Sequence, residues 1–277
     1  MQQLVKEKIG SKLYYPYKLC DYKPCYGYLF EEHTRGYDYW GYCDIDTLWG
    51  DMDAWLGIVM QEGYDRIGRY GHFTLYRNTE KMRMLYLHGD NKRLPVIARL
   101  PYIKQTAFPC NFDELGMNLI CEQAGLRFLK EVPLLNTSLG YKHLHSWDKR
   151  EEEQVWLWED GKVYSLTRDA DGKVKREERA YLHFMTFNLP LLTSWTNKMC
   201  VTHDGILSCM DMSDEEVLDK WGTPDTSEEH IYAQTKMKKR LKAKSRSRVK
   251  AEFKYCSLRA ITNIMQRYLY MMSPQRL

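Results

Sequence analysis

The spacing of apolar and polar positions predicts an α/β chain. An apolar, aromatic run at residues 40–46 is typical of a strand that ends in two aspartates, and the run at 51–60 is typical of a helix with acidic residues in its first turn. Alternation at 70–76 predicts another strand, and Asn78-Thr79-Glu80 is a helix start. Residues 89–111 contain three prolines, which indicate an irregular loop.

The second half of the sequence changes to a period of two. Apolar side chains at 155–158 alternate between two faces, as in a strand, within a predicted hairpin insertion at about 150–187. Asp-Gly dipeptides are hairpin-turn signals, and they occur at residues 160, 171 and 204. From Ser213 the chain becomes helical and charged. We therefore expect one domain over 1–212 and a helical, basic extension over 213–277.

Composition limits the classes of protein to which this chain can belong. A chain of 277 residues with 44% hydrophobic residues can bury one large core. It has no run near the ~18 apolar residues of a membrane-spanning helix, and its first residues lack the apolar segment of a signal peptide. Eight cysteines without a Cys-x-x-Cys pair or a His-Cys zinc spacing favour reduced thiols in the cytoplasm.

Charge is concentrated at the C-terminal end. Residues 236–277 contain 13 Lys or Arg and one Glu, a net charge of +12, which leaves −8 for the rest of the chain given the total of +4. Apolar residues recur at helical spacing from Ile261 to Met272, beside this basic run. Such a segment suits the anionic inner face of a membrane. Two alternatives are nucleic acid, for which no recognition motif is present, and a solvated helix packed on the domain.

Asp44 and Asp46 are the candidate metal ligands. Side chains two residues apart on a strand point to the same side, whereas Ile45 points to the other. Two carboxylates at a strand end form a site of hard oxygen ligands for Mn²⁺ or Mg²⁺, with positions left for phosphate oxygens. The alternative is that both acids begin a turn and face water.

Several ordered motifs surround these aspartates. They are Tyr17-Lys18-Leu19-Cys20-Asp21-Tyr22-Lys23-Pro24, Trp40-Gly41-Tyr42-Cys43-Asp44-Ile45-Asp46 and Gly71-His72-Phe73-Thr74-Leu75-Tyr76-Arg77-Asn78. This succession, over roughly residues 14–190, resembles a family of bacterial polysaccharide-biosynthesis glycosyltransferases with a GT-A-type fold. The resemblance implies a nucleotide-diphospho-sugar donor, a divalent metal and a sugar acceptor.

The resemblance also implies roles for individual residues. The family's Lys-Pro segment lies beside the donor, which would place Asp21 and Lys23 near phosphate or sugar; the alternative for Asp21 is a solvated or capping residue. His72 and Asn78 are candidates for the substrate pocket. A GT-A domain has about two βα units before its Asp-x-Asp, whereas 43 residues precede Asp44 here, so nucleotide binding stays open.

Two further groups of residues complete the expected active site. A helix is predicted to begin near Asp113 and Glu114, and a transferase of this type needs a carboxylate near the reactive carbon of the sugar. Either acid is a candidate, the structural alternative being acids at a helix start. In the resembling family a His-Phe pair follows such hairpins at a strand end, which makes His183 the expected third metal ligand.

The expected protein is therefore a GT-A-like glycosyltransferase. It would move a sugar from a nucleotide-diphospho-sugar, a UDP-sugar first of all, to a surface polysaccharide or a lipid-linked glycan, at the cytoplasmic face of the membrane. One alternative is a metal-dependent phosphodiester or nucleotide hydrolase that uses the same aspartates. Another is an inactive relative that binds a glycan or a protein partner.

Overall fold

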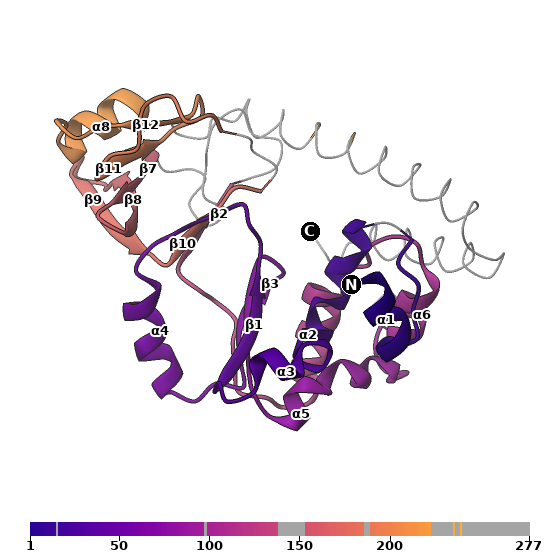
Figure 1. Ribbon diagram of the computed structural model, residues 1–277. Coiled ribbons are helices and arrows are strands. Elements are labelled where there is room, and N and C mark those ends of the chain that lie inside the picture. The colour runs from indigo at the N-terminus through magenta and orange to yellow at the C-terminus, as the bar shows by residue number, and fades with distance from the viewer. Residues whose placement is uncertain are drawn as a thin grey trace. The chain divides into compact units, whose positions relative to one another are not determined.

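The chain folds into two compact units in the computed structural model (Figure 1), which describes residues 1–14, 16–96, 99–137, 153–185, 189–222, 235 and 239. The first unit contains Met1–Asp44 and Gly63–Glu131, and the second contains Ile45–Glu62 and the described part of Val132–Leu241. Both contain mixed sheets with helices, so the protein is an α/β protein. The predicted basic extension from residue 236 lies almost wholly outside the described residues, and its membrane role stays a prediction.

The sheet of the first unit has the order β1-β4-β3-β5. Its strands are β1 (Tyr39–Cys43), β3 (Arg66–Tyr70), β4 (Phe73–Arg77) and β5 (Phe128–Leu129). The β1–β4 and β3–β4 pairs are antiparallel and the β3–β5 pair is parallel, which makes the sheet mixed. A register shift between Ile67 and Tyr70 bends β3 just before its tight turn into β4.

Short helices surround this sheet, and Figure 1 shows α1, α2 and α6 gathered on one side of β1 and β3. Apolar side chains of the sheet and of these helices form one core, in which Trp40 stacks on Tyr76 with ring centroids 4.6 Å apart. The helical elements of this unit are α1 (Gln2–Ile9), η1 (Pro16–Cys25), α2 (Tyr26–Leu29), α3 (Glu31–Thr34), α5 (Glu80–Arg83), η2 (Leu85–Asp90), α6 (Leu100–Gln105), η4 (Phe112–Gly116) and α7 (Met117–Gln123).

The second unit contains two sheets. The smaller, mixed sheet has the order β2-β10-β6, and the larger, antiparallel sheet has the order β12-β11-β7-β8-β9. The elements are β2 (Thr47–Trp49), α4 (Met52–Gln61), β6 (Leu134–Asn136), β7 (Gln154–Glu159), β8 (Lys162–Arg168), β9 (Val174–Arg179), β10 (Tyr181–His183), β11 (Lys198–Val201), β12 (Ile206–Ser208) and α8 (Asp214–Trp221). Figure 1 shows α8 beside the larger sheet.

The predicted hairpins are confirmed. Asp160 and Gly161 connect β7 to β8 with positive φ angles of 46° and 83°, as a tight turn of this kind requires. Gly172 and Gly205 lie in the next two turns. The α8 helix begins after Ser213, whose hydroxyl accepts a hydrogen bond from Glu216 N in a capping box. Among the described residues, no helix has the length and apolarity to cross a bilayer.

The loop predicted over residues 89–111 needs correction. Residues 89–111 are not irregular throughout, because α6 spans Leu100–Gln105 and Pro101 stands in its first turn, where a missing N–H costs nothing. Pro24 lies near the end of the 3₁₀ segment η1, and the following α-helix α2 begins at Tyr26. In both places proline marks a helical segment whose apolar positions are too few to show a period.

Candidate functional site

A tight turn between β3 and β4 organises the polar residues of the first unit. This turn, called here the Gly71 turn, consists of Gly71 and His72. The expectation that His72 lies inside one strand over 70–76 was wrong, because the chain reverses at Gly71 and pairs Tyr70 with Phe73. The ring of His72 is buried and stacks on Tyr70 at a centroid distance of 5.2 Å. His72 O accepts a hydrogen bond from Asp44 N at 2.9 Å, which fixes the end of β1 beside the turn.

Lys23 connects this turn to the first aspartate of the Asp-x-Asp motif. Its ammonium lies 2.5 Å from Asp44 Oδ1 and donates to Gly71 O at 2.8 Å. Burial lowers the pKa of Lys23. The hydrogen bond to Asp44 and the negative charge of Asp44 raise it by more, so the pKa of Lys23 lies above its ordinary value. Lys23 is therefore a fixed cation at the strand end, and it neutralises part of the charge of Asp44.

Asp113 and Glu114 approach the same turn from η4. Glu114 Oε1 accepts a hydrogen bond from Gly71 N at 2.9 Å. A Cβ atom added to Gly71 would lie 2.3 Å from Asp113 Oδ2, so only glycine leaves room for this carboxylate. The two acids lie on a π-helical turn, a geometry that occurs often at functional sites, which starts after Asn111 in the left-handed conformation (φ 57°).

The ionised form of Asp113 is disfavoured at its buried position. Only 5% of the residue is exposed. Burial raises the pKa of Asp113 well above its usual value, the neighbouring Glu114 and Asp21 raise it further, and Lys23 opposes them. A carboxyl group with a raised pKa can hold a proton near neutral pH and exchange it with a bound hydroxyl group.

Arg66 supports the Gly71 turn through the backbone of Asp113, a role that the sequence analysis did not predict. It is fully buried, and its Nη2 donates to Asp113 O at 3.3 Å. Its guanidinium lies over the rings of Tyr76 and Phe128, at 5.2 and 4.7 Å from their centroids. A lone arginine in an alternating strand is usually solvent-exposed, so the sequence offers no signal for this position.

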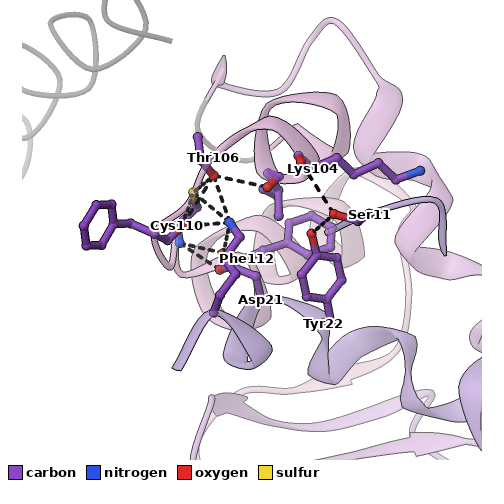
Figure 2. A network of polar contacts seen from close by, with 10 residues as sticks. Ser11, Asp21, Tyr22, Lys104, Thr106, Cys110 and Phe112 are labelled. Carbon is purple, nitrogen blue, oxygen red and sulfur yellow. Dashed lines mark hydrogen bonds and ion pairs between the residues drawn. The ribbon is translucent and has the colours of Figure 1, made fainter. Parts of the chain in front are cut away.

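Asp21, expected beside a donor phosphate or exposed, lies in a buried polar network (Figure 2). Its carboxylate accepts hydrogen bonds from Cys110 N at 2.8 Å and Phe112 N at 3.1 Å. It also pairs with the ammonium of Lys18 at 2.8 Å, both side chains being fully buried. Asp21 therefore holds the chain that enters η4. Its contact with a donor stays a prediction.

Asn78, expected in the substrate pocket, makes several hydrogen bonds within the protein. Its Nδ2 donates to Thr34 O at 2.6 Å and Tyr37 O at 2.8 Å, and its Oδ1 accepts from Arg83 at 2.9 Å. These bonds join the end of β4 to the segment before β1. Asn78 therefore has a structural role, and its contact with a substrate stays a prediction.

The second unit brings Asp46 and His183 together. β2 and β10 are antiparallel neighbours, and Thr47 faces His183 in their register, so Asp46 lies beside the end of β10. Phe184 N donates to Asp46 O at 2.9 Å, and His183 Nε2 lies 3.5 Å from Asp46 Oδ1. His183 is 6% exposed, whereas the carboxylate of Asp46 is about half exposed.

Asn136 orients the imidazole from the other side. Its Oδ1 lies 3.0 Å from His183 Nδ1, so that with this amide orientation Nδ1 carries the proton and the Nε2 lone pair points toward Asp46. An imidazole lone pair and a carboxylate that face each other repel unless a proton or a metal cation lies between them. Such an outer partner is typical of metal-binding histidines.

The donor set fits a divalent cation. Asp44, Asp46 and His183 offer two carboxylates and an imidazole, a combination found in Mn²⁺ sites. Asp46 and His183 belong to the second unit, and Asp44 is the last residue of the first, two positions before Asp46 along the chain. Asp51, by contrast, caps α4 by accepting a hydrogen bond from Ala54 N at 3.0 Å, as its place in a first helical turn predicted.

The comparisons with known proteins identify a family whose function is unknown. Residues 1–209 match the Family of unknown function (DUF6625), a match that covers more than half of the chain and every site residue described above. No curated protein and no solved structure gives a match. Any activity must therefore be argued from this chain's own residues.

Proposed function

The chain belongs to the DUF6625 family, whose function is unknown, and we propose that it is a metal-dependent glycosyltransferase of GT-A type. Its donor would be a nucleotide-diphospho-sugar, with UDP-sugars first, and its acceptor a surface polysaccharide or a lipid-linked glycan. The support comes from two groups of side chains: the metal-ligand set of Asp44, Asp46 and His183, and the acids beside the Gly71 turn.

The observation that carries the proposal is the approach of Asp46 to His183 at 3.5 Å. These residues are 137 positions apart in the chain (183 − 46 = 137), and the β2–β10 ladder places them side by side. Asn136 provides the acceptor that sets the tautomer of the histidine. Oxygen and imidazole ligands together favour Mn²⁺ among the cations that bind diphosphates.

The residues divide the chemistry between them. Asp44, Asp46 and His183 would hold the cation, which supplies positive charge to the diphosphate as it leaves the sugar. Lys23, held between Asp44 and Gly71, adds a fixed positive charge for phosphate oxygens. Asp113 has the raised pKa expected of a group that accepts the proton of an acceptor hydroxyl.

The experiment compares sugar transfer with the simpler hydrolytic reactions. The full-length protein is incubated with Mn²⁺ and a panel of UDP-sugars, with and without a mixture of oligosaccharide acceptors, and UDP release is followed. Bis(p-nitrophenyl) phosphate is offered in parallel as a general phosphodiester. We expect Mn²⁺-dependent UDP release that increases when an acceptor is present.

Two aspartate variants make the test specific. Asp46→Asn removes a proposed metal ligand, whereas Asp51→Asn keeps a hydrogen-bond acceptor at the cap of α4 and should retain activity. Hydrolysis of the phosphodiester without UDP release would support a hydrolase instead. Mn²⁺ binding that is equal in the wild type and in Asp46→Asn would contradict the metal site.

The basic segment suggests where the acceptor is met. We propose that residues 236–277, with a net charge of +12, attach the protein to anionic lipid at the cytoplasmic face of the membrane. Cosedimentation with phosphatidylserine vesicles and with neutral phosphatidylcholine vesicles tests this, using the full chain and one that ends at Thr235. Equal binding of both chains to both vesicle types would contradict it.

A further inference from the structure

Helix α4 of the second unit is apolar, yet none of its residues is buried. Ile58 is 68% exposed, and Ala54 and Val59 are exposed as well. Figure 1 shows α4 projecting away from the strands of its unit. Apolar residues of a helix normally lie against a core, so α4 presents an unusual apolar surface. Seven of its ten residues are apolar: Met52, Ala54, Trp55, Leu56, Ile58, Val59 and Met60.

The apolar residues of α4 face most directions around the helix axis. Successive residues of a helix are rotated by about 100°, so these side chains cover an arc of roughly 240°, whose two ends are Ala54 and Met60. The remaining polar strip consists of Asp53, Gly57 and Gln61. A helix that packs on one protein surface presents an apolar stripe of about 100°. A single protein partner would therefore leave much of the apolar arc of α4 in water.

The charges at the ends of α4 disfavour a second copy of the chain as its partner. Asp53 lies in the first turn, Glu62 follows the last residue, and no Lys or Arg occurs over residues 51–65. In an antiparallel pair of α4 helices, Asp53 of one copy would face Glu62 of the other. In a parallel pair each acid would face its own equivalent. Like charges repel in both arrangements, so neither is self-complementary.

A lipid bilayer can cover the wide apolar arc without a matching charge. Side chains that enter the boundary between headgroups and acyl chains contact hydrocarbon on several sides, while a polar strip stays among the headgroups. A helix of ten residues extends about 15 Å, half of the ~30 Å hydrocarbon core, so α4 has the length of an element that lies in the bilayer surface. Trp55 is of the residue type that is enriched at this depth.

We propose that α4 inserts its apolar arc into the surface of a lipid bilayer and so forms a hydrophobic membrane contact of the second unit. This contact differs from the proposed attraction of residues 236–277 to anionic lipid. Burial of apolar side chains does not require charged headgroups, and salt does not weaken it, whereas salt screens the attraction between charges. The proposal also stands independently of sugar transfer, because it rests on the exposure of α4 alone.

Neutral vesicles at high salt separate this contact from the basic segment. The full-length protein is sedimented with phosphatidylcholine vesicles at low salt and at about 1 M NaCl, where screening shortens to ~3 Å. We expect binding that does not decrease with salt. Ile58→Asn should lower the partition coefficient about tenfold or more, the equivalent of one isoleucine side chain left unburied. Leu191→Asn, at a 54% exposed leucine of the same unit, is the control and should bind like the wild type.

Bromine atoms on the acyl chains report which tryptophan reaches them. Vesicles of brominated phosphatidylcholine should quench the tryptophan fluorescence of the wild type, and Trp55→Phe should lose most of this quenching. Trp195→Phe, at a 45% exposed tryptophan outside α4, should retain it. Circular dichroism of each variant verifies folding.

Three results would overturn the proposal. The wild type might leave neutral vesicles unbound, Ile58→Asn might bind them as well as the wild type does, or the quenching might persist in Trp55→Phe. A dimer in light scattering that Ile58→Asn dissociates, together with no binding to neutral vesicles, would identify a second copy of the chain as the occupant of α4 instead.

Discussion

Asn136 Oδ1 lies 3.0 Å from His183 Nδ1, and the two residues are direct partners in the parallel pair of β6 and β10. On the opposite side of the ring, His183 Nε2 lies 3.5 Å from Asp46 Oδ1. The amide thus determines which nitrogen of the imidazole points to the carboxylate. The orientation of the candidate ligand depends on a residue that is not itself a ligand.

Replacing this amide tests the metal site without touching a ligand. We expect Asn136→Ala to lower Mn²⁺ affinity about 10–100-fold, the usual effect of losing an outer partner of a metal-bound histidine. Isothermal titration calorimetry with MnCl₂ measures the change. Asn91→Ala, at an exposed asparagine of the first unit, is the control. Unchanged affinity in Asn136→Ala would rule out a role for this amide in metal binding.

The Gly71 turn allows a second test. Gly71→Ala would place a Cβ 2.3 Å from Asp113 Oδ2, so the carboxylate must move or the turn must open, and we expect a loss of ~1–3 kcal/mol in unfolding free energy. Gly57→Ala is the matched control, because its Cβ would meet nothing within 4 Å in α4 and alanine favours a helix by about 1 kcal/mol. Urea denaturation of both variants distinguishes the predictions. Equal stability of the two variants would contradict close packing at Gly71.

The raised pKa of Asp113 predicts a specific pH dependence. In the folded protein this carboxyl keeps its proton to higher pH than in the unfolded chain, so its contribution to stability decreases as pH rises from about 4 toward the raised value. Asp113→Asn mimics the protonated acid and should remove this slope, so the variant should be more stable than the wild type near neutral pH. Thermal unfolding from pH 4 to 8 measures it. A variant that follows the wild-type slope would show that Asp113 titrates normally.

Lys18 and Asp21 form a buried ion pair whose removal should be costly. Lys18→Met leaves the Asp21 carboxylate buried without its cation, and we expect a loss of ~3–5 kcal/mol in unfolding free energy. Asp21→Asn in the same chain should restore part of this loss, because no charge is then left unpaired. Lys162→Met, at an exposed pair with Glu178, should leave stability unchanged. A small effect at Lys18 would indicate that the network in Figure 2 is solvated.

Local signals predicted the second unit well. The strand pairs confirm the hairpins at Asp160-Gly161, Asp171-Gly172 and Asp204-Gly205. These hairpins could be predicted because an Asp-Gly pair favours the backbone conformation of a turn by itself. The alternation of Val155 and Leu157 against Trp156 and Trp158 is confirmed by their separate clusters. Such features depend on residues a few positions apart, which a single sequence displays directly.

The site itself could be predicted only in part. The Asp-x-Asp spacing of Asp44 and Asp46 was readable, but the prediction that one strand carries both was wrong, because β1 ends at Cys43 and β2 begins at Thr47, and Ile45 between the aspartates is fully exposed. The partnership of Asn136 with His183 joins residues 47 positions apart through a parallel ladder. His72 was placed in a strand because the sequence alternates through the turn. No pattern in the sequence reveals that Gly71 leaves space for Asp113, since this depends on the approach of η4 to the turn.

The chain enters the second unit twice, and this determines how the protein can be divided. Strand β2 comes from Ile45–Glu62, whereas its neighbour β10 follows the second crossing at Val132. A fragment that starts at Val132 would lose β2 and expose the hydrogen-bonding edge of β10, which would recruit a strand from another molecule. A synthetic peptide of residues 45–62 supplied in trans is the natural complement for that edge. Two full-length chains that exchanged this segment would form a domain-swapped dimer, each carrying the other's Asp46.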